Sequence, residues 1–529
     1  MIYALFGINI LLMCYVTSKR YLEFLYILQL EKYKFNRFVN WFFANIKNKG
    51  LIIPLILSLI HLGLVFIIRY EYWFLGISGL INILYLPFIR TKKQKVKFVF
   101  TYRIKRLIVT SALAIIVFYI VTRLITNGFY NEIELILVSL IGLNFLIYDI
   151  LCIAYYVNKP IEKLIQKRFI IKAKKKLRDY NLDVIGITGS YGKTSTKMIV
   201  SHVLNKDFFV CKTPKSFNTP MGVSITINNN LKRIDQVLVC EMGATQIGDI
   251  KELVDIVNPK IGILTEIGPQ HLESFLNMSN IIKTKFELIE NLPKSGLAVL
   301  NYDNRFISGY KINNPVRIIK YGINSDDLDY RAININYDTS GSTFEVIFPN
   351  QERQLFKTKL LGKHNIYNIL AGIVIADYYK VDIKRLKNYV LNMQPVENRL
   401  QLKPFERFTI IDDSFNSNLI GFQQALDILN HFNNKKIIIT PGLVDLGKEQ
   451  YKINYELAPF IANTCDYVVL VGMKQTEAIY DGLIEAGFYK DKIFRTNNFY
   501  VGYQHVIDLF KEDFTLLIEN DLPDNYTEE

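Results

Sequence analysis

The residues best suited to chemistry lie in one glycine-rich segment, residues 186–196, which reads GITGSYGKTST. It follows a β-rich run and opens a helical pattern, the context that a phosphate-binding loop requires. Lys193 would reach the β- and γ-phosphates of a nucleotide, and Thr194 would bind Mg²⁺ through its hydroxyl. Position 187 is Ile, so the spacing departs from the strict phosphate-loop pattern. The residues expected to hold the nucleotide here are Gly189, Ser190, Gly192, Lys193, Thr194 and Ser195.

Other candidate residues follow buried strands. Glu241 ends the apolar run VLVC, where an acid linked to a metal beside the phosphates is expected. His271 comes shortly after the run at 261–265, at the kind of strand end where α/β proteins gather their sites. A lone histidine is more often structural. Lys283 and Lys285 begin a helix expected at the same edge, although by composition alone two lysines there are more often a solvated face.

From residue 181 the pattern predicts an α/β fold that positions these residues. Short β-rich runs such as 184–188, 237–241 and 261–265 alternate with helical patterns, which indicates parallel sheets with crossover helices. A stretch at about 330–360 interrupts this alternation and has a more antiparallel strand pattern. The sequence QPVENR at 394–399 marks a boundary before a second α/β unit that ends near residue 520.

The first 160 residues are expected to form an all-α membrane domain of about five spans. Their apolar stretches cover roughly 1–17, 51–68, 72–89, 107–126 and 133–156. Lys and Arg gather in alternate connections, which favours an outside N-terminus and a cytoplasmic position for everything after about residue 157. Buried helices of a soluble protein are the alternative.

Charge is distributed unevenly along the 529 residues, whose formal net charge is +14. Residues 1–180 hold 26 Lys and Arg against 8 Asp and Glu, so the basic excess belongs to the first third. Residues 161–180 read as a basic amphipathic connector near anionic inner-membrane lipids, or else as a solvated linker helix. The rest of the chain is slightly acidic, which argues against a nucleic-acid partner. Five scattered cysteines give neither a disulfide framework nor a zinc site.

Residues 181–520 resemble the Mur ligase family, closest to the branch that adds D-alanyl-D-alanine to the muramyl peptide. The resemblance rests on a series of motifs in family order: TGSYGKTSTK at 188–197, FNTPMGV at 217–223, EMGA at 241–244, IGPQHLESF at 267–275, LAVLN at 297–301, GKHNIYN at 362–368, NRL at 398–400 and IDDSFNSN at 411–418. It implies a central ATP-binding Mur ligase domain at 181–396, with a phosphate loop, and a Rossmann-like C-terminal domain at 397–529.

In that family ATP phosphorylates an acceptor carboxylate, and the amine of an amino acid or dipeptide attacks the acyl phosphate to form an amide. The resemblance implies that Lys193 and Thr194 hold phosphates and Mg²⁺, and that Glu241 and His271 are metal ligands. Lys285 matches a lysine that is often carbamylated, which turns a cation into a carboxylate-like metal ligand. The catalytic residues implied are Lys193, His271 and Lys285.

The resemblance also places residues further along the chain at the nucleotide. Asn365 would contact the adenine side, and Arg399 and Asp413 would reach the nucleotide when the domains close. Asn398 and Leu419 depart from the Gly and Pro usual at those positions.

The largest departure is at the front, where a membrane unit replaces the usual domain that binds a UDP-sugar. The acceptor is therefore either a soluble UDP-muramyl peptide, a lipid-linked precursor or another envelope polymer. A membrane transport NTPase and an inactive scaffold are the alternatives from other classes. The sequence leaves the amine donor and the oligomeric state open.

Overall fold

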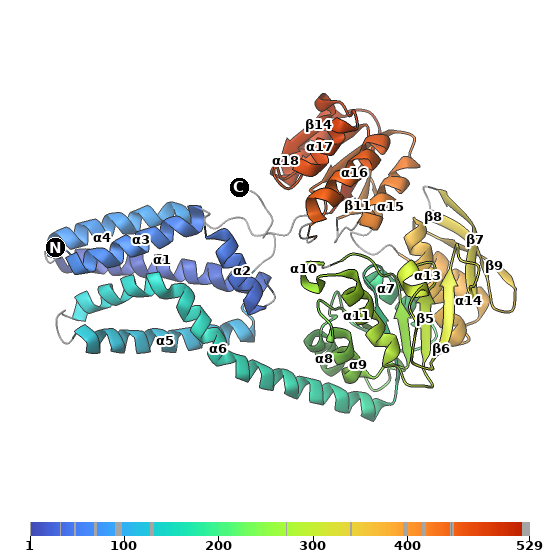
Figure 1. The fold of residues 1–529 in the computed structure, drawn as a ribbon, viewed down its shortest axis with the longest axis horizontal. Coiled ribbons are helices and arrows are strands. Elements are labelled where there is room, and N and C mark those ends of the chain that lie inside the picture. The colour runs from blue at the N-terminus through green and yellow to red at the C-terminus, as the bar shows by residue number, and fades with distance from the viewer. Residues whose placement is uncertain are drawn as a thin grey trace. The chain divides into compact units, whose positions relative to one another are not determined.

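The computed structural model describes the whole chain except residues 1, 32, 47–48, 68–70, 90–97, 127–131, 271, 339–340, 395–399, 415–418, 445, 447–448 and 521–529. The chain divides into two compact units, Met1–Lys167 and Arg168–Glu529 (Figure 1). Two of the predicted site residues, His271 and Arg399, lie outside the described residues.

The N-terminal unit is helical throughout its described part. Its elements are α1 (Ile2–Leu30), α2 (Phe35–Asn45), α3 (Lys49–Ile67), α4 (Glu71–Tyr85), η1 (Leu86–Ile89), α5 (Tyr102–Thr126) and the first part of α6 (Glu132–Tyr180). Two of these helices, α5 and α6, are long and apolar enough to cross a membrane, and shorter apolar helices cover Leu51–Leu64 and Leu75–Tyr85. Length and composition of two helices are weak support, so the five-span membrane domain stays a prediction.

Polar side chains meet inside this helical unit. The Arg20 guanidinium is buried and donates from Nη1 to Asn144 Oδ1 at 2.6 Å and to Ser58 Oγ at 3.2 Å. Ser58 in turn lies 2.9 Å from the Tyr85 hydroxyl. Hydrogen bonds to neutral groups therefore satisfy this buried cation, because polar atoms removed from water need partners.

The central domain is built on a nine-stranded sheet of order β2-β3-β1-β4-β5-β6-β7-β8-β9. The strands are β1 (Asp183–Thr188), β2 (Val210–Lys212), β3 (Val237–Glu241), β4 (Ile261–Leu264), β5 (Leu297–Asn301), β6 (Arg317–Gly322), β7 (Tyr330–Asp338), β8 (Gly341–Ile347) and β9 (Arg353–Thr358). Pairing is parallel from β2 to β7 and antiparallel from β7 to β9. The structure thus confirms both the parallel sheet and the antiparallel stretch near 330–360.

Helices cover both faces of this sheet, since central parallel strands are apolar on both sides. The helices are α7 (Lys193–Leu204), α8 (Pro220–Asn229), α9 (Asp249–Val257), α10 (Leu272–Phe275), α11 (Met278–Glu290), α12 (Arg305–Ser308), α13 (Lys363–Tyr378) and α14 (Ile383–Leu391). One core packs α7, α13 and α14 against the sheet, and a second core packs α8, α9 and α11. The end of α6 joins the second core through the fully buried Ala173.

The C-terminal domain has a six-stranded sheet of order β10-β11-β15-β12-β13-β14, in which only β10 is antiparallel to its neighbour. Its strands are β10 (Gln401–Pro404), β11 (Phe408–Asp413), β12 (Lys435–Thr440), β13 (Tyr467–Val471), β14 (Ile493–Thr496) and β15 (Phe514–Glu519). Its helices are α15 (Leu419–Asn430), α16 (Gln450–Thr464), α17 (Glu477–Glu485), η3 (Lys490–Lys492) and α18 (Phe499–Leu509). This agrees with the second α/β unit predicted from the sequence.

Candidate nucleotide and metal site

The glycine-rich segment forms a tight loop between β1 and α7, as predicted. Gly192 caps α7 with a left-handed backbone (φ 77°), and a Cβ placed there would lie 2.7 Å from Asn368 Oδ1. Gly189 is equally confined, because its Cβ would lie 2.1 Å from Thr265 Oγ1. The loop therefore needs glycine at both positions, and its backbone leads into the free amide groups of a helix N-terminus, an arrangement that attracts anions.

Neighbouring strand ends hold this loop in place. The Ser190 amide donates to the Glu266 carbonyl at 2.6 Å, and the Ser190 hydroxyl donates to the Gly268 carbonyl at 2.9 Å. The Tyr191 hydroxyl donates to the Pro269 carbonyl at 2.8 Å. These bonds fix the loop before any ligand arrives, which reduces the ordering cost of binding.

Lys193 folds back over the loop that precedes it. Its Nζ donates to the carbonyls of Gly189 at 2.8 Å and Ser190 at 2.7 Å. The ammonium thus lies where a triphosphate would wrap around the loop, as expected of a lysine in this position.

Glu241 is the centre of the polar cluster beside the loop. It is buried at the end of β3 and accepts from Thr194 Oγ1, Lys197 Nζ and Asn218 Nδ2, each at 3.0 Å. Burial by itself raises the pKa of the Glu241 carboxyl, but the charges of Lys197 and Lys193 and the hydrogen bonds outweigh it and hold the pKa below its usual value. Glu241 is therefore an anion at neutral pH.

Lys285 has the opposite electrostatic character. Its side chain on α11 is buried, and in the described part of the chain it makes no hydrogen bond or ion pair; the Phe275 ring centre lies 6.0 Å from its Nζ. Burial, and then the nearby charge of Lys193, lower the pKa of Lys285 far below the ordinary lysine value. Such a shift favours the neutral amine over the ammonium, and neutral amines are nucleophiles.

The donor set beside the loop suits Mg²⁺. The Thr194 hydroxyl and the Glu241 carboxylate are hard oxygen donors 3.0 Å apart, and Mg²⁺ usually takes one or two protein oxygens together with substrate phosphates and waters. Within the described ranges no group of three or more His, Cys, Asp and Glu side chains could hold a metal on its own. These residues fit a metal that arrives with a nucleotide.

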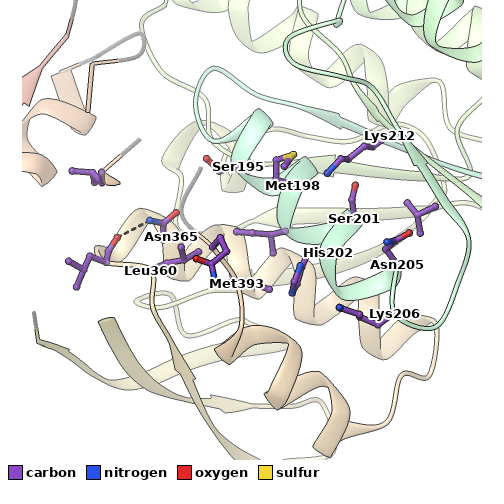
Figure 2. A pocket seen from close by; sticks show the side chains of 15 residues that line it. Ser195, Met198, Ser201, His202, Asn205, Lys206, Lys212, Leu360, Asn365 and Met393 are labelled. Carbon is purple, nitrogen blue, oxygen red and sulfur yellow. Dashed lines mark hydrogen bonds between the residues drawn. The ribbon is translucent and has the colours of Figure 1, made fainter. Parts of the chain in front are cut away.

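A cavity of about 350 Å³ runs along one face of α7 (Figure 2). Ser195 and His202 line it from α7, Asn205 from the C-cap of that helix, and Asn365 from the start of α13. A helix rises about 1.5 Å per residue, so Ser195 to Asn205 spans about 15 Å. Asn365 Nδ2 donates to the Leu361 carbonyl at 2.8 Å, which fixes this side chain at the cavity wall.

The structure brings most of the predicted residues together. The loop residues Gly189 to Ser195 surround the start of α7, Glu241 contacts Thr194, and Asn365 shares a cavity with Ser195. Asp413 ends β11 and accepts the Leu400 amide at 3.2 Å; its predicted contact with the nucleotide stays a prediction. So do the roles of His271 and Arg399.

Sequence analysis missed two charged groups of this site. Lys197 lies one helical turn after Lys193 and pairs with Glu241. The position of Glu241 at a strand end was the one signal in the sequence that could have suggested this pair. Glu266 follows β4 as Glu241 ends β3, so the same strand-end rule would have found it. Burial raises the pKa of Glu266 to about 7.

Residues 187–376 match the family model described as the Mur ligase middle domain. The central part of the chain is therefore similar to the Mur ligase middle domain.

The chain is also similar to curated proteins named UDP-N-acetylmuramoyl-tripeptide–D-alanyl-D-alanine ligase. The one from Buchnera aphidicola (Baizongia pistaciae) is 32% identical over 271 residues, which cover 51% of this chain and 58% of that protein. The Escherichia coli protein is 26% identical over 56% of this chain and 66% of its own length. The Rickettsia prowazekii protein is 28% identical over 63% of this chain and 74% of its own length. The chain thus spans less than two thirds of the first two relatives.

Solved structures agree on the fold. MurF from Acinetobacter baumannii aligns with a TM-score of 0.61 at 21% identity, covering 67% of this chain and 77% of that one. MurF from Thermotoga maritima, solved in complex with ADP, aligns with a TM-score of 0.60 at 24% identity, covering 67% and 80%. The two α/β domains therefore have the Mur ligase fold.

Proposed function

We propose that this protein is an ATP-dependent amide ligase of bacterial cell-envelope synthesis, most like the enzymes that add D-alanyl-D-alanine to UDP-MurNAc-tripeptide. The observation that carries the proposal is the cluster of Lys193, Thr194 and Glu241 inside a Mur ligase middle domain. Its substrates are ATP, an acceptor carboxylate and the amine of an amino acid or dipeptide. No nucleic-acid partner is included.

ATP binds with its phosphates on the loop and its adenosine in the cavity along α7. The backbone amides at the start of α7 and the ammonium of Lys193 hold the phosphates, while Ser195 and Asn365 line the nucleoside side. Arg399 and Asp413 of the C-terminal domain complete the nucleotide contacts. Mg²⁺ bound by Thr194, Glu241 and His271 supplies charge neutralisation when it is present.

The proposed reaction has two steps. A γ-phosphoryl group passes from ATP to the acceptor carboxylate, which releases ADP and leaves an acyl phosphate. The incoming amine attacks the acyl carbon, and the tetrahedral intermediate expels phosphate to leave an amide. Lys193 stabilises the charge that develops on the phosphoryl oxygens.

Lys285 fits the role of a carbamylated lysine. Carbamylation requires a neutral amine that attacks CO₂, and the lowered pKa of the buried Lys285 favours that form. The product is an anion that would offset the charge of Lys193 and extend the metal-binding set beyond Glu241. A ¹³C carbamate signal after incubation with labelled bicarbonate, absent from Lys285→Gln, tests this role.

A lipid-linked acceptor is the second candidate, favoured by the helical unit at residues 1–167, which contains α5 and α6. In this proposal residues 1–160 are a multi-pass membrane domain with an outside N-terminus. Apart from Lys176, which donates to the Asn228 and Leu231 carbonyls, the basic residues of 161–180 lie against anionic inner-leaflet lipid. Both catalytic domains are cytoplasmic in this proposal. Protease access to an N-terminal tag in intact spheroplasts, and to a C-terminal tag only after lysis, tests the topology.

The first experiment measures ADP release and product mass for the full chain in mild detergent. Assays contain UDP-MurNAc-tripeptide with D-Ala-D-Ala, with single amino acids, or a lipid-linked acceptor in place of the nucleotide. We expect an amide product in one of these assays, and a loss of about two orders of magnitude in Lys193→Ala. ATP consumption without any amide product would reject the ligase and favour a transport NTPase. Cells that tolerate Lys193→Ala would favour a scaffold.

A further inference from the structure

Lys197 is a buried charge that the proposed reaction does not use. Its side chain on α7 has no exposed surface, and its Nζ lies 3.0 Å from Glu241 Oε2. The ammonium also donates a hydrogen bond to the carbonyl oxygen of Lys215. Lys197 is more deeply buried than Lys193, the lysine of the phosphate loop, which is only half-buried.

The ion pair occupies the groups that would bind a divalent metal. Glu241 Oε2 receives both the Lys197 ammonium and the Thr194 hydroxyl at 3.0 Å, and Oε1 receives Asn218 Nδ2 at 3.0 Å. Both carboxylate oxygens are therefore engaged, one of them by a full positive charge. A metal bound to Oε2 would lie close to that ammonium, and like charges at such a distance repel strongly in a buried site.

The loop before α8 is shaped to hold this arrangement. Thr213 Oγ1 accepts the Glu241 amide at 3.1 Å, and Lys215 adopts a left-handed backbone (φ 45°) as it presents its carbonyl to Lys197. Gly243 leaves room for Asn218, because a Cβ there would lie 2.7 Å from the Asn218 Cγ. Backbone strain of this kind persists only where surrounding contacts impose it.

We propose that Lys197 is a positioning residue that acts as a built-in counter-ion of Glu241 and keeps divalent metal from binding before the nucleotide. The inference rests on the proposed use of Mg²⁺ and ATP at this loop. Without nucleotide, the paired Lys197 already balances the carboxylate, and an added divalent ion leaves excess positive charge. With nucleotide, the triphosphate supplies the negative charge that lets metal and ammonium coexist.

A purely structural role for Lys197 predicts something different. In that case the ion pair only offsets the cost of burying Glu241, and removal of the lysine lowers stability without changing metal affinity. In the counter-ion role, removal leaves a buried carboxylate that recruits a divalent ion.

The test measures Mn²⁺ binding to the full chain in detergent by electron paramagnetic resonance. The samples contain no acceptor and no amine. We expect wild type to bind Mn²⁺ at least tenfold more tightly with a non-hydrolysable ATP analogue than without it. We expect Lys197→Met to gain at least tenfold in nucleotide-free affinity, and the matched Lys197→Arg, which keeps the charge, to gain nothing. The double variant Lys197→Met/Glu241→Gln should lose the gain.

Equal nucleotide-free affinities in wild type and Lys197→Met would overturn the proposal. If Lys197→Met does not fold, the wild-type comparison still decides, because tight Mn²⁺ binding without nucleotide would also overturn it. The Mn²⁺ experiment contains no acceptor or amine, so its outcome does not depend on whether the protein forms an amide. If no amide product forms but Mn²⁺ binds as predicted, the proposed ligase activity is rejected and the counter-ion role of Lys197 is kept.

Discussion

Replacement of Glu266 by Gln should change how stability of the central domain depends on pH. The carboxyl is largely buried beside the phosphate loop, and its folded-state pKa of about 7 lies well above the usual value of 4.5. Because the folded state holds the proton more tightly, stability is greatest below pH 4.5 and falls as the pH rises through 7. The separation of roughly two and a half pH units corresponds to about 3 kcal/mol.

The Glu266→Gln variant carries no titrating group there. We therefore expect wild type to lose about 3 kcal/mol relative to Glu266→Gln between pH 4.5 and pH 8, with most of the change between pH 5 and 7. Any constant cost or gain from the amide cancels in this difference.

Hydrogen exchange is the right assay for this prediction. Both tryptophans, Trp41 and Trp73, lie in the first 167 residues, so tryptophan fluorescence reports the other unit. Exchange of peptides from β1 and β4, read by mass spectrometry, gives the opening free energy near Glu266. Wild type and variant are compared at the same pH, which cancels the chemical pH dependence of exchange. A difference that is the same at pH 5 and pH 8 would refute the reasoning.

Three further changes give separate tests. Gly192→Ala should lower central-domain stability by about 1–2 kcal/mol for the left-handed backbone alone and should abolish binding of a fluorescent ATP analogue, measured by melting and titration. Lys176→Met removes two hydrogen bonds to carbonyls at the end of α8 and should speed exchange there, with a cost of about 1 kcal/mol. Tyr367→Phe removes a 2.7 Å bond to Asp303 and should cost about 1 kcal/mol in calorimetric melts without altering nucleotide affinity.

Local patterns predicted much of the central domain. The run at 184–188 is almost entirely buried and pairs in parallel on both sides, and the glycine spacing after it correctly indicated a loop leading into a helix. These features are encoded within a few residues of each other. The order of the nine strands is different, because it depends on contacts between segments far apart in the chain.

The residues missed in the site also depend on contacts between segments far apart in the chain. Lys197 and Glu241 are 44 residues apart, and a lysine on a helix is normally solvent-facing, so composition alone argued against a buried pair. The lowered pKa of Lys285 also follows mainly from tertiary burial and not from neighbours in sequence. The membrane prediction rests on hydropathy and loop charge. Among the described helices, only α5 and α6 are both long and apolar enough to support it.

The contact between Lys197 and residue 215 runs through a main-chain carbonyl, so evolution can vary the side chain at position 215 without losing it. What must be kept is the left-handed turn, which glycine or asparagine adopts more readily than lysine. A Lys215→Gly exchange should therefore be silent for the ion pair. Homologues with a different residue at this position can share the same electrostatic arrangement, although a comparison of side chains would score the position as unrelated.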